Sequence, residues 1–196
     1  MPLPATIEDA KAAMRRDMIA RRDGLPVAER HQAAETIAGR TFPVAVPPGT
    51  MVSGYMPLKS EISPIPLMKA LLAAGATLAL PSIAGRGKPL LMRAYAFGDA
   101  LDAGMWGILQ PKAVAAEIEP DVLIVPLLAF DRRGHRLGYG AGYYDMTVDR
   151  LRGRKPVAAI GIAFAAQEVE QVPATERDAR LDLVLTERET IDCRGA

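Results

Sequence analysis

The N-terminal part of the chain has the periodicity of an amphipathic helix. Between residues 6 and 22, apolar side chains recur every three or four positions, which places them on one helix face. Thr6 and Asp9 have the spacing of a capping box, so they mark the start of this helix. The apolar positions are Ile7, Ala10, Met14 and Met18.

From residue 50 onward, short apolar runs alternate with helical segments. Further helices are predicted at 27–39, 65–74 and 143–152, and strands at 51–56, 76–81, 121–126, 157–164 and 181–186. The middle three runs are apolar on both faces, as parallel strands usually are. This alternation predicts an α/β fold whose mostly parallel sheet is covered by helices on both sides. Without a long linker or a repeat, residues 1–196 are expected to form a single domain.

Composition narrows the class of protein. The 196 residues are 49% apolar and 24% charged, which is ordinary for a folded globular chain. A formal charge of +1 provides no overall attraction to nucleic acid or anionic lipid, so any anion site must be local. The single cysteine excludes an intrachain disulfide and a Cys-x-x-Cys pair. Because we find no apolar signal core or membrane-length apolar run, we expect a cytoplasmic enzyme or binding protein.

The glycine-rich stretch RLGYGAGYYD, residues 136–145, is the first candidate for chemistry. We expect the apolar run 122–130 to form a buried strand and DRRGHR to form a turn, so this stretch lies between a strand and the helix at 143. Glycines there allow backbone N–H groups to approach an anion, and the helix start adds its positive dipole end. The stretch matches neither a P-loop nor a complete dinucleotide fingerprint. A purely conformational role is the alternative.

Two aspartates and two N-terminal cations are further candidates. Asp145 would sit in the first turn of its helix, where the dipole alone explains an acid; the alternative is a Mg²⁺ ligand, with Asp178 as a second carboxylate. Lys11 and Arg15 lie one helical turn apart, which suits two cations on one polyphosphate, although exposed cations often serve only solubility. With Arg22 they are expected to form a basic row at the edge of the buried helix face.

Other side chains give weaker signals. Glu61 follows a strand, and Trp106, the only tryptophan, lies among turn-forming residues, either as a packing anchor or as an aromatic plate for a flat heterocycle. Two histidines, His31 and His135, are too few for a histidine-rich metal site. The sequence lacks G-x-S-x-G, and nothing marks Cys193 as a nucleophile.

Taken in order along the chain, these segments resemble the 5-formyltetrahydrofolate cyclo-ligase family, also called 5,10-methenyltetrahydrofolate synthetases. The resemblance runs from residue 11 to about residue 187, and its most distinctive block is the central one. The matching segments are Lys11-x-x-x-Arg15, YMPLKSE, MWGILQP, DVLIVPLLAFDRRGHRLGYGAGYYD and QVPATERDARLDLVLTE.

The resemblance implies a three-layer α/β/α fold similar to the NagB/RpiA/CoA-transferase group, and an assignment for each matching residue. It implies magnesium at Asp145 and Asp178, and catalytic roles for Lys11, Arg136 and Asp145. Folate contacts are implied at Met56, Glu61, Trp106, Tyr139, Gly140, Ala141, Gly142 and Tyr143. ATP contacts are implied at Lys11, Arg15, Arg136, Leu137, Gly138, Tyr139, Gly140, Ala141, Gly142, Tyr143 and Tyr144.

The sequence departs from the family at two positions of this block. Ala141 stands where glycine is common, which requires an ordinary backbone conformation there, and Met146 stands where a basic residue is frequent. Neither position is implied to bind magnesium, so the departures concern affinity more than reaction type.

The implied reaction is ATP-dependent closure of 5-formyltetrahydrofolate to 5,10-methenyltetrahydrofolate, with Mg²⁺ as cofactor. Such phosphoryl transfer needs positioning and charge neutralisation rather than a nucleophilic side chain. The implied partners are ATP and the folate, without nucleic acid or membrane, in a monomer or weak homodimer. The alternatives are a sugar-phosphate isomerase or CoA-transferase of similar fold, for which Glu61 is the one candidate nucleophile, and a nucleotide- or folate-binding module without turnover.

Overall fold

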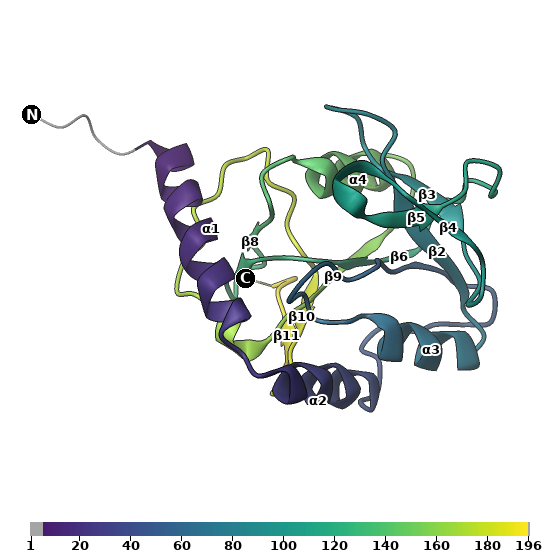
Figure 1. The fold of residues 1–196 in the computed structure, drawn as a ribbon, viewed down its shortest axis with the longest axis horizontal. Coiled ribbons are helices and arrows are strands. Elements are labelled where there is room, and N and C mark those ends of the chain that lie inside the picture. The colour runs from purple at the N-terminus through teal and green to yellow at the C-terminus, as the bar shows by residue number, and fades with distance from the viewer. Residues whose placement is uncertain (1–5, 196) are drawn as a thin grey trace, which may run out of the picture.

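The computed structural model describes residues 6–195, in which four α-helices surround a central sheet (Figure 1). The helices are α1 (Ile7–Asp23), α2 (Val27–Ala38), α3 (Ile65–Ala73) and α4 (Tyr143–Arg152). Within this described part, the sheet has the strand order β11-β10-β9-β6-β1-β2-β3. Its strands are β1 (Met51–Ser53), β2 (Thr77–Ser82), β3 (Leu91–Ala94), β6 (Val122–Val125), β9 (Ala158–Ile162), β10 (Leu183–Leu185) and β11 (Thr190–Asp192).

The centre of the sheet is parallel and its two edges are antiparallel. Strands β2, β1, β6, β9 and β10 pair in parallel, whereas β3 and β11 run antiparallel to their neighbours. The chain passes from β1 through α3 to β2 in one direction along the sheet, and from β6 through α4 to β9 in the other. The direction of winding therefore reverses between β1 and β6, which are hydrogen-bonded neighbours.

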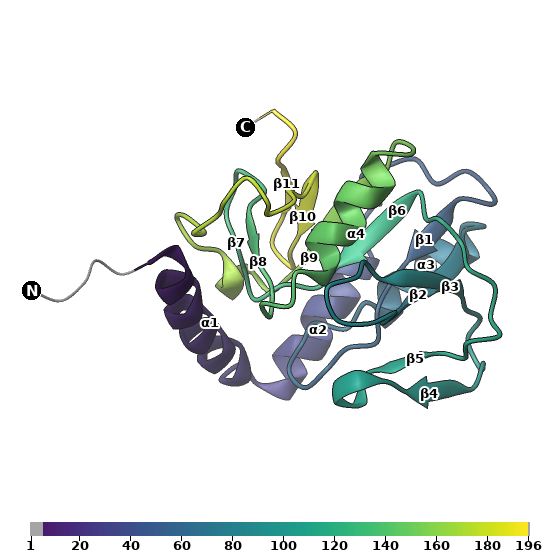
Figure 2. The same ribbon diagram turned by 90° about the horizontal axis from the view of Figure 1, so that it is seen from above.

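Helices cover both faces of the sheet, as the sequence predicts. Helices α2 and α3 lie together on one face and α4 lies on the other, so the molecule has three layers (Figures 1 and 2). Side chains of β6 alternate between the layers: Ile124 packs with the cluster that includes α2 and α3, and Leu123 and Val125 pack with the cluster that includes α4. Because the parallel strands are buried on both faces, their sequences read as unbroken apolar runs.

The predicted helices and central strands are confirmed to within a few residues. The α1 capping box is present, with the Thr6 hydroxyl accepting from the Asp9 N–H and the Asp9 carboxylate accepting from the Thr6 N–H. The expectation of one strand over 122–130 is wrong. β6 ends at Val125, and the chain then forms a separate hairpin of β7 (Ala129–Phe130) and β8 (Arg136–Leu137), closed by the predicted turn.

A second hairpin lies outside the main sheet. It consists of β4 (Leu101–Ala103) and β5 (Leu109–Pro111), joined by a short 3-10 turn, η1 (Met105–Gly107), that contains Trp106. The α1 helix packs against the β7–β8 hairpin through a small apolar cluster that includes Met18, Leu128 and Leu137. Among the residues that the structure describes, no helix combines the length and the apolar character that a membrane span requires.

Candidate functional site

The site predicted from the sequence lies where the winding of the sheet reverses. The segment after β1 carries Met56 and Glu61, and the segment after β6 leads through the β7–β8 hairpin to the glycine loop, residues 138–142. In open α/β sheets, ligands bind beyond the carboxyl ends of the strands at such a reversal. The topology therefore brings together two candidate segments that lie far apart in the sequence.

The glycine loop has a backbone that its glycines permit. Gly140 has φ 101° and Gly142 has φ 67°, a left-handed conformation that is strained for other residues. A Cβ atom on Gly140 would lie 3.2 Å from Cζ of Arg15, so glycine also allows close packing against α1. Ala141 is outside the left-handed region, so its methyl group is compatible with the loop.

The glycine loop leads directly into the amino end of α4. Gly142 is the N-cap residue and provides no side chain to cap the helix. The first N–H groups of a helix have no partner within that helix, and the helix dipole makes them a favourable place for an anion. The loop and the helix start thus lie where a bound anion would be favoured, and phosphate binding there stays a prediction.

Two cations of α1, Lys11 and Arg22, face the interior of the molecule. Lys11 and Arg22 are buried, so the expectation of a basic row along the edge of the apolar face is wrong for these two side chains. Arg15 is partly exposed, and its Nε donates to the carbonyl oxygen of Gly138 at 3.0 Å. The long aliphatic stems of these residues pack as apolar surface while their charged ends reach the loops. Arg15 and Arg22 of α1 therefore contact the glycine loop directly, at Gly138 and Tyr139.

Two ion pairs form the charged centre of the site. The Lys11 ammonium group donates to both carboxylate oxygens of Asp178, at 2.8 and 2.7 Å, and Arg136 donates to the Asp145 carboxylate at 2.7 Å. The Asp145 carboxylate also accepts from the N–H of Ala179, the residue after Asp178, at 3.1 Å. The two pairs are therefore neighbours, and the structure brings together Lys11, Asp145 and Asp178 from three distant parts of the chain.

The two carboxyl groups experience different surroundings. Burial raises the pKa of Asp145, and the nearby negative charge of Asp178 adds to this effect, against the opposing influence of Arg136 and of the Ala179 N–H. Burial also acts to raise the pKa of Asp178, but hydrogen bonds from Lys11 and Thr175 outweigh it, so the pKa lies below the ordinary value. The two carboxyl groups lie close together, and each is paired with a cation.

This donor set is compatible with a bound magnesium ion. Mg²⁺ prefers one or two carboxylates together with phosphate oxygens and water, whereas a dedicated protein cage would need more ligands. Within residues 6–195, no group of three or more His, Cys, Asp or Glu side chains could hold a metal. Asp145 and Asp178 fit an ion that arrives with a phosphate-bearing ligand rather than one bound by the protein alone.

A second group of polar residues surrounds Glu61. Its carboxylate accepts from the Leu58 N–H at 2.8 Å, and Tyr139 lies close enough to lower its pKa. Burial is the main reason why the pKa of Glu61 lies above its ordinary value, and Arg22 is a nearby positive charge that lowers it. Burial likewise raises the pKa of Tyr139 to about 12. Glu61 and the glycine loop therefore meet at Tyr139.

Trp106 and Met56 border this region on different sides. The Trp106 ring is 63% exposed, and its centroid lies 6.2 Å from that of Tyr143, the first residue of α4. Trp106 also has a φ of 59°, an unusual conformation for a non-glycine residue that is more common at functional sites. Met56 is partly buried and packs against the core beside α2 and α3. Of the two interpretations of Trp106, an exposed aromatic plate fits better than a packing anchor.

A pocket of about 610 Å³ adjoins the charged centre. Asp178 lines it together with Arg133, His135, Arg152 and Thr175. Among the described residues, Lys11 and Asp145 are not part of its lining, so the ion pairs lie at the border of this hollow. The pocket size is within the range of small-molecule sites.

The residues that the sequence excluded from chemistry have structural roles. Cys193 is buried, and burial raises the pKa of its thiol to about 11, which makes it a poor nucleophile. His135 is partly buried and lies at the end of the turn between β7 and β8, with Nδ1 3.3 Å from the Asp131 carboxylate.

Sequence reasoning did not select three polar residues that the structure places beside the candidate site. Thr175 donates to Asp178 through its N–H group and its hydroxyl, and Ser60 and the buried Arg22 lie next to Glu61 and Tyr139. For Arg22, the sequence did contain a signal, because it belongs to the same row of α1 cations as Lys11 and Arg15. The other two lie in loops, where periodicity carries no information.

The fold and the site together define a class: a three-layer α/β protein with a glycine loop, a helix start and paired charges at the reversal point of its sheet. Comparison with known proteins narrows the class. The sequence profile of the 5-formyltetrahydrofolate cyclo-ligase family matches residues 7–187, and this chain belongs to that family.

Individual relatives agree with this assignment. A 5-formyltetrahydrofolate cyclo-ligase from Mycolicibacterium smegmatis is 33% identical over 190 residues, covering 93% of this chain and 96% of the relative. One from Escherichia coli K12 is also 33% identical, covering 85% and 94%. The NMR structure of Aquifex aeolicus 5,10-methenyltetrahydrofolate synthetase superimposes with a TM-score of 0.76 at 27% identity, covering 94% of this chain and 93% of that one. The predicted family and α/β fold are thereby confirmed.

Proposed function

We propose that this protein catalyses the ATP-dependent cyclisation of 5-formyltetrahydrofolate to 5,10-methenyltetrahydrofolate, with release of ADP and phosphate. Family membership over residues 7–187 supports the reaction. The observation that carries the site assignment is the meeting of the Lys11–Asp178 and Arg136–Asp145 ion pairs beside the glycine loop. Such an arrangement provides cations for phosphate, carboxylates for a divalent ion and backbone donors in one place.

The chemistry of the substrate explains why such a site is needed. The formyl group on N5 is an amide and a weak electrophile, and its oxygen must leave before N10 can close the ring. The formyl oxygen attacks the γ-phosphorus of ATP and displaces ADP, which gives an iminium phosphate. N10 then attacks the iminium carbon and loses its proton, and the carbon–oxygen bond breaks to release phosphate. The protein's task is to position these groups and to balance their charge.

The cations and the loop would bind the triphosphate. Arg15 contacts the loop, and Lys11 and Arg136 form the ion pairs with Asp178 and Asp145, so the charges of these three cations would offset those of the phosphates. Backbone N–H groups from Gly138 to Tyr144, at the start of α4, would donate to phosphate oxygens. Burial of Lys11 and Arg136 strengthens these interactions because little water competes for the charges.

The two carboxylates would hold Mg²⁺. When bound, the ion would neutralise phosphate charge and help to align the transferred group. In the ligand-free protein, Asp145 and Asp178 are occupied by Arg136 and Lys11. Binding of metal and triphosphate together would exchange both ion pairs for new ones, whereas either ligand alone would leave buried charges without partners. We therefore expect Mg²⁺ and ATP to strengthen each other's binding.

The folate would lie on the other side of the glycine loop. Glu61 and Tyr139 would offer the folate a carboxylate and a hydroxyl. Trp106, which lies beside Tyr143, would offer it an aromatic face. Met56 and the loop residues Gly140, Ala141 and Gly142 would contribute apolar and backbone contacts. The loop would thus contact both substrates, which places the formyl oxygen near the terminal phosphate.

We also propose that the protein acts in the cytoplasm as a monomer or weak homodimer, with small molecules rather than nucleic acid or membrane as partners. The formal charge of +1 supports the absence of polyanion binding. Size-exclusion chromatography with light scattering would measure the oligomeric state.

One assay tests the proposed function. Purified protein is mixed with 5-formyltetrahydrofolate, ATP and Mg²⁺, and methenyl absorbance and phosphate release are followed together. The proposal expects equal amounts of both products and loss of turnover when the metal is chelated. Folate binding without ATP consumption would indicate a binding module. Turnover of a sugar phosphate or CoA ester instead would indicate an isomerase or transferase.

A further inference from the structure

Arg22 is a buried cation without a counter-ion. Its side chain is 2% exposed, and among the described residues no carboxylate lies within ion-pair distance of it. Nε donates to the Ser60 hydroxyl at 3.0 Å and Nη2 to the Tyr139 hydroxyl at 2.7 Å, while Nη1 is buried without a hydrogen-bond partner. Burying an unpaired guanidinium is unfavourable, so stability does not explain its presence.

The contacts of Arg22 connect three segments of the chain. Arg22 comes from the last turn of α1, Tyr139 from the glycine loop and Glu61 from the segment after β1. Arg22 donates to the Tyr139 hydroxyl, and Tyr139 in turn lies close enough to the Glu61 carboxylate to influence its pKa. The Arg22 guanidinium also lies over the Tyr139 ring, with Cζ 5.7 Å from the ring centroid. This relay leaves Tyr139 one favourable orientation.

We propose that Arg22 is a positioning residue for the folate side of the site: its guanidinium holds the Tyr139 hydroxyl in place beside the Glu61 carboxylate that would contact the substrate. The proposal rests on the proposed function. A pterin ring presents adjacent N–H groups that a carboxylate can accept in pairs, so an ionised Glu61 is the form that suits it. Without a nearby cation, a carboxyl group buried in this way would favour its neutral form.

The surroundings of Glu61 leave Arg22 as the cation that acts on it. The groups that face Glu61 are Arg22 from α1, Tyr139 from the glycine loop, Tyr55 after β1 and Tyr144 from α4. The three tyrosines are neutral below pH 10, and burial is the main reason why the pKa values of Tyr55 and Tyr144 are raised further. Loss of the Arg22 charge should therefore shift the titration of Glu61 upward.

The experiment compares Arg22→Gln, which removes the charge, with Arg22→Lys, which retains it. Titration calorimetry measures 5-formyltetrahydrofolate binding and, separately, Mg²⁺–ATP binding. We expect Arg22→Gln to weaken the folate at least about 10-fold and ATP less than about 3-fold, and Arg22→Lys to recover most of the folate affinity. Equal losses for both ligands, with no recovery by lysine, would overturn the proposal in favour of a purely structural role.

A second measurement needs no substrate. In the ligand-free protein, ¹³C NMR follows the Glu61 carboxyl titration, with Glu61→Gln assigning its signal. Arg22→Gln should raise the pKa of Glu61. Ser60→Ala removes the other hydrogen bond of the same guanidinium and should leave the pKa of Glu61 unchanged. Its folate affinity should stay within about 2-fold of wild type. An unchanged Glu61 titration in Arg22→Gln would overturn the proposal.

The two measurements separate failure of this inference from failure of the proposed function. Arg22→Gln could shift the Glu61 titration although the protein does not bind 5-formyltetrahydrofolate. That result would support the link between Arg22 and Glu61 and overturn the assignment of the site to folate. If Arg22→Gln does not fold, Tyr139→Phe breaks the same relay and leaves the buried charge in place. It should then raise the pKa of Glu61 and weaken folate binding, and failure to do either would overturn the relay.

Discussion

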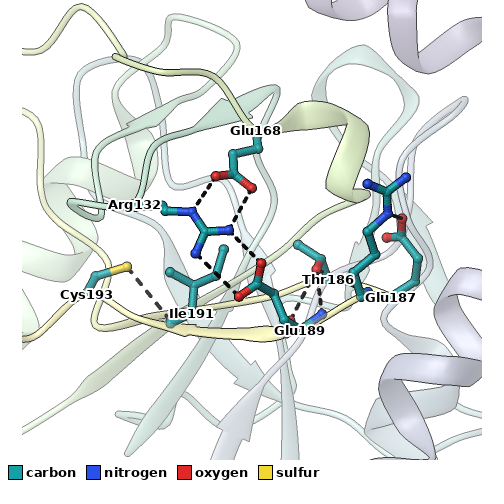
Figure 3. A network of polar contacts seen from close by, with 8 residues as sticks. Arg132, Glu168, Thr186, Glu187, Glu189, Ile191 and Cys193 are labelled. Carbon is teal, nitrogen blue, oxygen red and sulfur yellow. Dashed lines mark hydrogen bonds and ion pairs between the residues drawn. The ribbon is translucent and has the colours of Figure 1, made fainter.

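Two groups of ion pairs in this protein use the same chemistry in different surroundings. At the candidate site, the side chains of Lys11 and Arg136 are only 8% and 4% exposed. On the surface, Arg132 is 57% exposed and lies between Glu168 and Glu189, at 2.6 and 2.5 Å (Figure 3). The surface group has the shorter contacts. Solvent nevertheless screens it, so contact distance is a poor guide to importance.

The difference in burial indicates which of the two groups of ion pairs has charges that a ligand would use. Arg132 connects the turn between β7 and β8 to η2 (Ala165–Gln167) and to the turn between β10 and β11, and water can replace each of its contacts. If Lys11 or Arg136 lost its carboxylate and stayed buried, it would become an uncompensated charge, which is strongly destabilising. A ligand that supplies both a cation and anions can replace these partners. The buried pairs are therefore the place where we expect the proposed metal-bound polyphosphate to bind, whereas the exposed Arg132 group gives no reason to expect a ligand.

The strongest test of this contrast removes a carboxylate from the buried group. Asp145→Asn should lower turnover by about 1,000-fold or more, because the metal loses a ligand and Arg136 loses its counter-ion. It should also lower the free energy of unfolding by about 2 kcal/mol, since Arg136 stays buried. Methenyl absorbance and urea denaturation measure the two effects. Asp17→Asn, an exposed change on α1 away from the pocket lining, should leave turnover unchanged. An active Asp145→Asn would remove this residue from the metal assignment.

Removing a cation from the same group should have a smaller, ligand-specific effect. Lys11→Ala should weaken ATP binding by about 10 to 100-fold and folate binding by much less, because Lys11 contacts only the phosphate side of the site. Titration calorimetry with each ligand separates the two. Arg16→Ala, an exposed change on the same helix, serves as the control. Equal losses for ATP and folate would argue against a phosphate role for Lys11.

The third prediction concerns Glu61, whose replacement should stabilise the protein at neutral pH rather than destabilise it. Because burial raises the pKa of Glu61 above its ordinary value of 4.5, its contribution to stability falls as pH rises from 4.5 through the folded-state pKa. Ionised Glu61 therefore destabilises the protein at neutral pH. Glu61→Gln should raise Tm at pH 7 by a few degrees, or about 1 kcal/mol, and lose this advantage near pH 4, while folate binding weakens about 10-fold. A variant that is less stable at pH 7 would contradict the burial argument.

The smallest effect is expected at the surface. Arg132→Ala should leave turnover unchanged and alter Tm by less than about 2 °C, with the difference disappearing in high salt, because an exposed ion pair contributes little and is screened. Thermal unfolding at low and high salt measures this. A loss of turnover here comparable to that of Lys11→Ala would erase the distinction between the two groups.

Local patterns in the sequence predicted most of the fold. The four helices and the five parallel strands lie where periodicity and apolar runs place them, because helix capping and two-sided burial leave a signature within a few residues. The edge strands β3 and β11 and the two hairpins were not predicted. These strands lie at the edges of the main sheet or outside it, so their apolar pattern is weaker than that of the central strands.

The sequence by itself determined the elements, the glycine loop before α4 and, through the family resemblance, the candidate residues. Tertiary structure alone decided which of these residues meet. Lys11 contacts Asp178 across 167 positions, and Arg22 is buried beside Tyr139 although its helical position predicts an edge residue. The physical reason is that periodicity reports backbone conformation over one or two turns, whereas the order of strands in the sheet and the docking of α1 depend on packing between segments far apart in the chain.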